Sequence, residues 1–449
     1  RAAWTVYSKV ASAVLELVQR DEIMLSESLL LFLASLDEGE HVPELYHRLV
    51  TRHLSERRLG EAQRLLYDAV PSRGFSERSK ACMQTVLAAD RMRLALLQGN
   101  MQSAERTRAL SDRSVDADAC ELAAGDLALQ KARLTFHGGP TSTTTALLKR
   151  AVMVYQELDD QSGLARANLD FGLVLLAQEN LLGAREYFLL AGHSADNSSD
   201  IYEQIRARQL TMICDFVYGN LSRALAGAAA LDEVSAAAGM REVQLFAELT
   251  RGRVLFELGR YAEAADAFSR GRSRSRLYGM SQPGSTMEHW LARSLVYDER
   301  VRRGVTILKG DGKSVESLFF LAEALLRRGE HAQAITAVEE GLNSPSSGAG
   351  PVEGISWASG FAPLEDRAIG VIAGSDVLRH QMMALRGYVL AESGQTEEGV
   401  REMHRLTREM RISEIDPYNR LYFYLYSLIL PESGELNLED GTTVLGKAV

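Results

Sequence analysis

The sequence predicts an all-α fold, an α-solenoid in which antiparallel helix pairs stack on one another. Three observations support this prediction. The composition favours helix, because only 9 of the 449 residues are proline and aromatic residues make up 7%. Glycines recur at a fixed spacing along the chain, as expected of residues that end helices. Segments with apolar residues at helical spacing flank these glycines.

Length and charge exclude several classes of protein. A chain of 449 residues is too long for one compact core, since single cores stop growing at about 250–300 residues. The net charge of −10 argues against nucleic acid as a general partner, because an acidic surface repels phosphate groups. The longest strongly apolar stretch, residues 29–36, is shorter than the roughly 20 residues that a membrane-spanning helix needs. We expect a soluble protein. Its compartment is either the cytoplasm or, if a signal peptide preceded Arg1 and was removed, the periplasm.

A spacing of 40 residues runs through the middle of the chain. Positions 99, 139, 179, 219 and 259 are occupied by Gly99, Gly139, Glu179, Gly219 and Gly259. Glycine suits the left-handed backbone conformation that ends a helix before a tight turn. The next step falls on Glu299, within a polar break of the apolar pattern. The spacing predicts one helix pair for every 40 residues.

The stretch 248–271 illustrates one such pair. Leucine and valine line its first half up to Leu258, and the chain turns at Gly259. The second half is lined by small alanines and by Phe268, which we expect to fill the gap between pairs. Neither helix can bury its apolar face alone, so the pairs must stack.

This stretch resembles the tetratricopeptide repeat family, in a long-period form like that of bacterial proteins. Residues 258–264 followed by Phe268 are similar to the family's turn and second helix, and Gly252 falls at the small position of its first helix. Three further copies are Gly172, Ala184, Phe188 and Ala191; Ala322, Gly329, Ala334 and Val338; and Gly387, Gly394, Gly399 and Met403. The period departs from the family's usual length of about 34 residues. The aromatic residue near the start of the first helix is also replaced, by Asn168 and Glu248 in two copies.

The resemblance implies a non-catalytic scaffold that holds a peptide or protein partner in a concave groove and needs no cofactor. One alternative is the sensor or regulatory region of a larger signalling or transcription-regulating protein. Another is an enzyme built on a helical solenoid. Homodimerisation through an end of the stack is compatible with the first two hypotheses.

Four regions follow from the pattern. Residues 1–39 are expected to form capping helices, and residues 40–343 the helical repeats, with six pairs over 75–309 and one over 312–343. Residues 344–374 form a Gly-, Ser- and Pro-rich insertion, either a tolerated surface loop or a lip that folds over the groove. Residues 375–449 hold a last pair, an aromatic capping helix over 417–430 and a tail.

Candidate binding residues follow from the family's geometry, in which the first helix of each pair lines the groove. Counting back thirteen, six and three positions from the turns brings several arginines and phenylalanines to equivalent places. Arginine matches a carboxylate and phenylalanine anchors a partner, which would suit a peptide with an acidic group or a free C-terminus. The candidates are Arg93, Arg133, Phe136, Arg166, Arg206, Phe216, Arg253 and Phe256. The alternative is that these phenylalanines form the core between repeats and the arginines pair with Glu on adjacent helices. Charge reversal at Arg93, Arg133 and Arg253 together should abolish partner capture without unfolding the protein.

The sequence contains no strong local motif for catalysis, phosphate binding or metal binding. Residues 310–314 resemble the end of a phosphate-binding loop, but Ile307 stands where that motif needs glycine. The histidines show no metal-ligand spacing, so we expect no metal site. Cys82, Cys120 and Cys214 are far apart and odd in number, which indicates small buried side chains and no disulfide scaffold.

Overall fold

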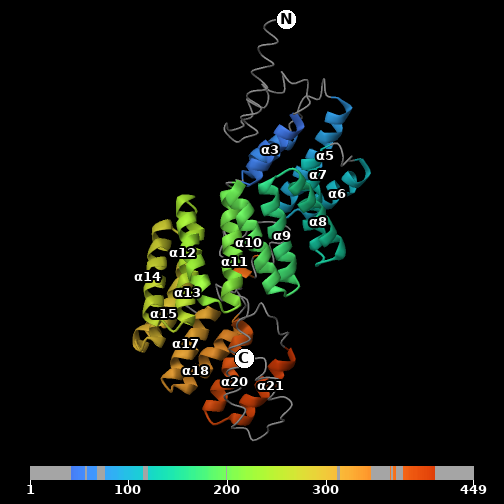
Figure 1. The fold of residues 1–449 in the computed structure, drawn as a ribbon. Coiled ribbons are helices and arrows are strands. Elements are labelled where there is room, and N and C mark those ends of the chain that lie inside the picture. The colour runs from blue at the N-terminus through green and yellow to red at the C-terminus, as the bar shows by residue number, and fades with distance from the viewer. Residues whose placement is uncertain are drawn as a thin grey trace. The chain divides into compact units, whose positions relative to one another are not determined.

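The computed structural model describes residues 42–55, 58–67, 76–114, 120–198, 200–310, 314–344, 365, 368–370 and 378–409. These residues form helices and short turns and contain no strand. Figure 1 shows the helices in antiparallel pairs, for example α20 and α21 near the red end of the colour scale. The predicted all-α solenoid fold is therefore confirmed.

Each pair consists of a first and a second helix joined by a short turn. The pairs are α3 (Val42–Ser55) and α4 (Leu59–Tyr67), α5 (Glu77–Leu97) and α6 (Met101–Ser114), α7 (Glu121–Phe136) and α8 (Ser142–Glu157), α9 (Gln161–Ala177) and α10 (Leu181–Ser198), α11 (Ile201–Val217) and α12 (Leu221–Ala237), α13 (Arg241–Glu257) and α14 (Tyr261–Tyr278), α15 (Ser281–Tyr297) and α16 (Val301–Gly310), α17 (Val315–Arg327) and α18 (His331–Asn343), and α20 (Leu378–Glu392) and α21 (Thr396–Glu409). Six of these pairs lie within residues 75–310, one within 312–343 and one within 378–409.

The turns explain the 40-residue spacing. All six positions from 99 to 299 on that spacing have a positive φ, including the non-glycine residues Glu179 and Glu299. Positive φ also occurs halfway between them, at Asp159, Gly239 and Gly279, where one pair passes to the next. A left-handed residue therefore follows nearly every helix of this region, and the helices from α7 to α15 are 16 to 18 residues long.

Hydrogen bonds at the turns show why these residues end helices. At the first turn, the Asn100 amide donates to the Ala95 carbonyl at 2.8 Å and the Gly99 amide donates to the Leu96 carbonyl at 3.0 Å. The same two bonds recur after α11 and α13. They satisfy carbonyl groups that the end of a helix leaves without partners.

Helix pairs are held by a large side chain packed against a small residue. A Cβ atom added at Gly172 on α9 would lie 2.3 Å from Cε1 of Phe188 on α10. The same relation joins Gly387 on α20 to Met403 on α21, with a distance of 3.0 Å to Cγ. These are the small and large positions that the sequence resemblance identified.

Contacts divide the chain into two compact units. Unit 1 contains the described residues up to 178 together with residues 187–204, and unit 2 contains residues 179–186 and the described residues from 205 onward. In unit 1, first helix α7 packs on α5 and on α9. In unit 2, α15 packs on α13 and on α17, and α17 packs on α20. Equivalent positions on successive first helices therefore become neighbours within each unit.

The prediction for the cysteines was wrong for two of the three. Cys82 on α5 and Cys120, which precedes α7, form a disulfide across 38 residues of sequence. Their separation is close to the repeat period, and α5 packs on α7, so the fold brings the two side chains together. Cys214 is free and buried, as expected.

Several predicted elements lie outside the described residues. These are the N-terminal cap (1–39), most of the insertion (344–374), the aromatic helix (417–430) and the tail. The division into four regions remains a prediction. Among the described helices, none is both long enough and apolar enough to cross a membrane.

Candidate functional site

All eight candidate residues lie on first helices, and their side chains are buried. Arg93 is on α5, Arg133 and Phe136 on α7, Arg166 on α9, Arg206 and Phe216 on α11, and Arg253 and Phe256 on α13. Burying an arginine requires compensating partners, because an isolated charge is costly to remove from water. Those partners define what each candidate can do.

In unit 1, a buried histidine links three helices. His47 on α3 places Nδ1 3.0 Å from Asp90 on α5 and Nε2 2.7 Å from Asp126 on α7. Burial alone lowers the pKa of His47, but the two carboxylates outweigh it and raise the pKa to about 10. Burial raises the pKa of Asp90 more than His47 lowers it. The imidazole is therefore charged at neutral pH and pairs with both aspartates.

Two candidate arginines of unit 1 also pair with aspartates on neighbouring first helices. Arg133 donates from Nε to Asp170 on α9 at 2.5 Å, and Arg166 places a guanidinium nitrogen 3.3 Å from Asp126 on α7. Asp126 in addition accepts a hydrogen bond from the Tyr155 hydroxyl. Burial would raise the pKa of Asp126, but Arg166 and His47 hold it well below its usual range. The alternative interpretation, arginines paired with acids on adjacent helices, describes these two side chains, although the acids are Asp and not Glu.

Arg93 is in a less favourable environment. Burial and the positive charges of Arg166 and Arg133 together lower the pKa of its guanidinium to about 10, although the nearby Asp126 carboxylate raises it. Unit 1 thus concentrates several cations within a buried cluster whose acids are already engaged.

In unit 2, a candidate arginine lies between aromatic rings. The guanidinium carbon of Arg253 on α13 lies 3.8 Å from the ring centroid of Trp290 on α15 and 5.5 Å from that of Phe216 on α11. Phe256 packs edge-on against Trp290, with ring centroids 5.6 Å apart. Stacking of this kind stabilises a guanidinium that has left water. Phe216 and Phe256 therefore contribute to the packing between first helices.

Arg293 on α15 occupies the same position one pair later. Its guanidinium carbon lies 4.7 Å from the Phe320 ring centroid and 4.9 Å from both the Phe256 and Trp290 centroids. It also donates to Glu323 on α17 at 2.7 Å. The sequence reasoning missed Arg293, although counting six positions back from Glu299 leads to it.

A further register of polar residues was missed as well. Nine positions before the turns at 99, 139 and 179 lie Asp90, Gln130 and Asp170, and nine positions before Glu299 lies Trp290; all four are buried. Three of the four contact a candidate arginine or its neighbour: Asp170 and Gln130 bind Arg133, and Trp290 stacks on Arg253. Comparison of all positions relative to the turns, and not only those three, six and thirteen residues before them, would have identified these residues.

Several buried polar atoms of unit 2 have no hydrogen-bond partner among the described residues. They are the side-chain nitrogens of Gln209 and Gln381, Nε1 of Trp290, Nε of Arg293, and one carboxylate oxygen each of Glu316 and Glu323. Each of these side chains is at most 9% exposed. They lie on the four first helices α11, α15, α17 and α20. We call this set the polar row.

Arg206 on α11 pairs with an acid from outside the helix pairs. A guanidinium nitrogen donates to Glu365, which lies in the sequence between α18 and α20. The two side chains are 5% and 2% exposed. The insertion thus contributes at least one carboxylate that pairs with a side chain of a first helix in unit 2.

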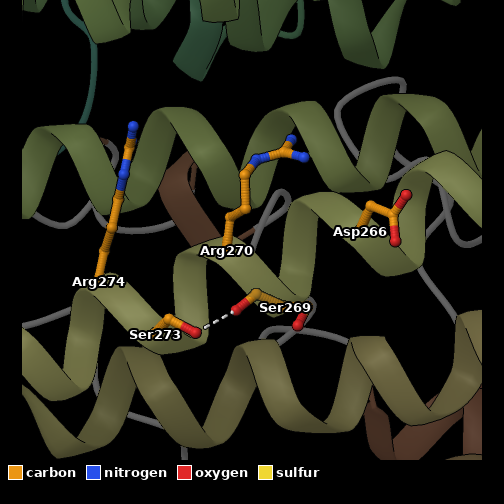
Figure 2. A pocket seen from close by; sticks show the side chains of 5 residues that line it. All are labelled: Asp266, Ser269, Arg270, Ser273 and Arg274. Carbon is orange, nitrogen blue, oxygen red and sulfur yellow. Dashed lines mark hydrogen bonds between the residues drawn. The ribbon is translucent and has the colours of Figure 1, made fainter.

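A surface hollow lies along second helix α14. Figure 2 shows Asp266, Arg270 and Arg274 on one side of this helix, with Ser269 and Ser273 beside them. Arg270 donates to Glu248 at 2.9 Å and Arg274 donates to Asp232 at 3.2 Å. Because acids of the neighbouring helices already engage both arginines, we assign this hollow no binding role. Among the described residues, no group of three or more His, Cys, Asp or Glu side chains is arranged to hold a metal ion.

Comparison with known proteins identifies the fold alone. By sequence, the chain matches no protein-family model and no curated protein. By structure, it resembles the apo form of RapI at 10% identity with a TM-score of 0.52, over 91% of this chain and 96% of that chain. NprR in complex with its cognate peptide NprX (12% identity, TM-score 0.45, 84% and 90% coverage) and yeast Tom70 (10% identity, TM-score 0.36, 99% and 99% coverage) are more distant. The fold is therefore that of tetratricopeptide-type helical repeat proteins, as the sequence resemblance predicted.

Proposed function

We propose that the chain binds a peptide or an extended, acidic segment of a protein along the first helices of unit 2. The observation that carries this proposal is the polar row. A buried polar atom without a partner costs about 1–3 kcal/mol, and native proteins retain few of them. Six such atoms lie on first helices of unit 2, where the polar groups of a ligand would supply the missing partners.

The chemistry of the polar row favours a peptide. Gln209, Gln381, Trp290 and Arg293 offer donors, whereas Glu316 and Glu323 offer acceptors. An extended backbone presents C=O and N–H groups at regular intervals and can pair with both kinds. Arginines beside the row add a preference for carboxylates.

The burial of the candidate arginines changes how this proposal must be tested. Reversing the charge of Arg133 would place a carboxylate against Asp170, and at Arg253 it would place one between aromatic rings. Such variants would unfold the protein through uncompensated burial of charge. Neutral substitutions within the polar row avoid this effect.

The test uses peptides selected from a random twelve-residue phage library on the immobilised protein. Synthetic copies are then titrated by fluorescence anisotropy against the wild type and the variant Gln209→Leu with Gln381→Leu. Removing two donors should weaken binding by about tenfold, since each contributes roughly 0.5–1.5 kcal/mol. Gln333→Leu on the exposed face of α18 is the matched control. Equal affinity for the folded double variant and the wild type would contradict the proposal.

A further inference from the structure

The N-cap of α7 differs from those of three helices packed against it. Ser76, Thr141 and Asp160 precede α5, α8 and α9, and each accepts a hydrogen bond from a first-turn amide through its side-chain oxygen. Cys120 precedes α7 and makes no such bond. Its sulfur is held in the disulfide with Cys82 on α5. The first turn of α7 therefore lacks the side-chain acceptor that satisfies helix amides in its neighbours.

A sulfur released from the disulfide would supply that acceptor. A thiolate at a helix N-terminus faces amide hydrogens and the positive end of the helix dipole, and both stabilise its charge. Helix α7 is 16 residues long, so its dipole is well developed. Cys82 lies inside α5, where the amides already donate within the helix, and it gains nothing comparable.

Burial and nearby charge do not reverse this difference between the two sulfurs. Cys120 is 4% exposed and Cys82 is 7% exposed, and both belong to one apolar cluster, which disfavours a thiolate at either position. Arg78, one turn before Cys82, and Glu121, next to Cys120, are exposed, so water and salt screen their charges. Cys120 is therefore the better leaving thiolate, and Cys82 is the sulfur that a nucleophile attacks.

We propose that the link between Cys82 and Cys120 is a site of thiol–disulfide exchange with a dithiol reductant. One thiolate of the dithiol attacks Sγ of Cys82, which forms a mixed disulfide and breaks the bond to Cys120. Cys120 leaves as the thiolate that caps α7. The second thiol of the reductant then displaces Cys82. The dithiol is oxidised to a disulfide, its two electrons reduce the link, and its two protons end on Cys82 and Cys120.

Opening the link loosens unit 1 without dismantling it. His47 on α3 still pairs with Asp90 on α5 and with Asp126 on α7, so buried charges continue to join the three helices. The constraint that is lost lies at the start of α7. The redox state of the surroundings therefore sets how firmly this end of α7 is attached to α5, independently of any bound peptide.

The first experiment follows opening of the wild-type disulfide by dithiothreitol under native conditions at about pH 7.5. Samples are quenched with acid, alkylated in denaturant and counted for new thiols by mass spectrometry, while circular dichroism reports global unfolding. The opening rate should rise in proportion to the dithiothreitol concentration with the helical signal unchanged. A rate that levels off at the rate of global unfolding would overturn the inference, because the link would then open only in unfolded molecules.

Two single variants test the asymmetry between the sulfurs. Cys82→Ser leaves Cys120 as a thiol, and Cys120→Ser leaves Cys82. In the native variants, iodoacetamide should alkylate Cys120 at least about tenfold faster than Cys82, because only the Cys120 thiolate caps a helix. The buried Cys214 is present in both variants and serves as the internal control. Equal rates, or a faster reaction of Cys82, would contradict the assignment of Cys120 as the leaving group. The wild-type kinetics require neither variant, so they decide the proposal if one variant does not fold.

Hydrogen exchange tests the structural consequence. Reduction of the wild type should speed amide exchange in the first turns of α7 several-fold and leave exchange in α13, in unit 2, unchanged. Glutathione disulfide, added after removal of the reductant, should restore the slow exchange. Identical exchange in the oxidised and reduced proteins would show that the link does not control the attachment of α7, against the proposal.

Discussion

The backbone of Gly252 on α13 is in direct contact with the ring of Phe268 on α14. A Cβ atom added at Gly252 would lie 2.4 Å from Cε1 and 2.6 Å from Cζ of that ring. Phe268 is fully buried, so the ring has nowhere to move. The two helices of this pair can approach each other only because one residue has no side chain.

Gly252→Ala should therefore destabilise the protein. Alanine normally stabilises a helix by about 0.5–1 kcal/mol relative to glycine, but forcing a methyl group into a filled core costs about 1–3 kcal/mol. We expect a lower midpoint of thermal unfolding. Gly60→Ala is the matched control, because nothing lies within 4 Å of a Cβ added there and Gly60 is in helix α4. A midpoint that rises for both variants would contradict the packing described here.

Gly252 and Phe268 could be identified from the sequence because their spacing is local. The turn at Gly259 lies between them, and each copy of the repeat preserves the offsets, so the period and the small and large positions reinforce one another. Helix number and helix length follow from the same local signals, since each left-handed residue ends a helix wherever it occurs.

The polar contacts could not be identified in this way. Arg293 was overlooked because the candidate positions were counted back only from the five turns between 99 and 259, although Glu299 also has a positive φ. The pairing of His47 with Asp90 and Asp126 depends on how three separate helices pack. The contact of Arg206 with Glu365 spans 159 residues and follows no period. Sequence patterns locate positions on helices but not partners between them.

The raised pKa of His47 predicts that the folded protein loses stability at alkaline pH. Its folded pKa of about 10 exceeds the ordinary histidine pKa of 6.5, so its contribution to stability is fully present below about pH 6.5 and is lost as pH rises toward 10. Asp90, whose pKa is raised by burial, adds no stability at alkaline pH. The midpoint of thermal unfolding of the wild type should fall steadily between pH 6.5 and 10.

The variant His47→Gln tests the origin of this fall. Removing the cation leaves two buried carboxylates facing a neutral side chain, which should cost about 3–5 kcal/mol at pH 6. The difference from the wild type should shrink at pH 9.5, where the wild type has lost most of the contribution. Hydrogen exchange in α3 provides a local measurement. A difference that stays constant over this pH range would mean that His47 acts through its shape and not its charge.

The disulfide between Cys82 and Cys120 should be detectable by counting thiols. The native protein should not react with a thiol reagent, because burial raises the pKa of Cys214 to about 12. Denaturation without reductant should expose one thiol, and reduction should expose three. Closing 38 residues stabilises the fold by about 4 kcal/mol in the chain-entropy model, so Cys82→Ser should lower the unfolding midpoint of the oxidised protein. Three reactive thiols without reductant would disprove the pairing.

The pair between Arg293 and Glu323 distinguishes a structural arginine from a binding one. Arg293→Met should cost about 3–5 kcal/mol, because it leaves the buried Glu323 carboxylate without its cation. Adding Glu323→Leu removes that charge and should restore most of the stability, since ring stacking alone contributes only about 0.5–2 kcal/mol. If the single and double variants are equally unstable, the rings hold Arg293 and the ion pair does not. If the double variant is stable and still binds the selected peptides with unchanged affinity, Arg293 belongs to the core alone. Weakened binding by a stable double variant would mean that the Arg293 and Glu323 pair contacts the ligand.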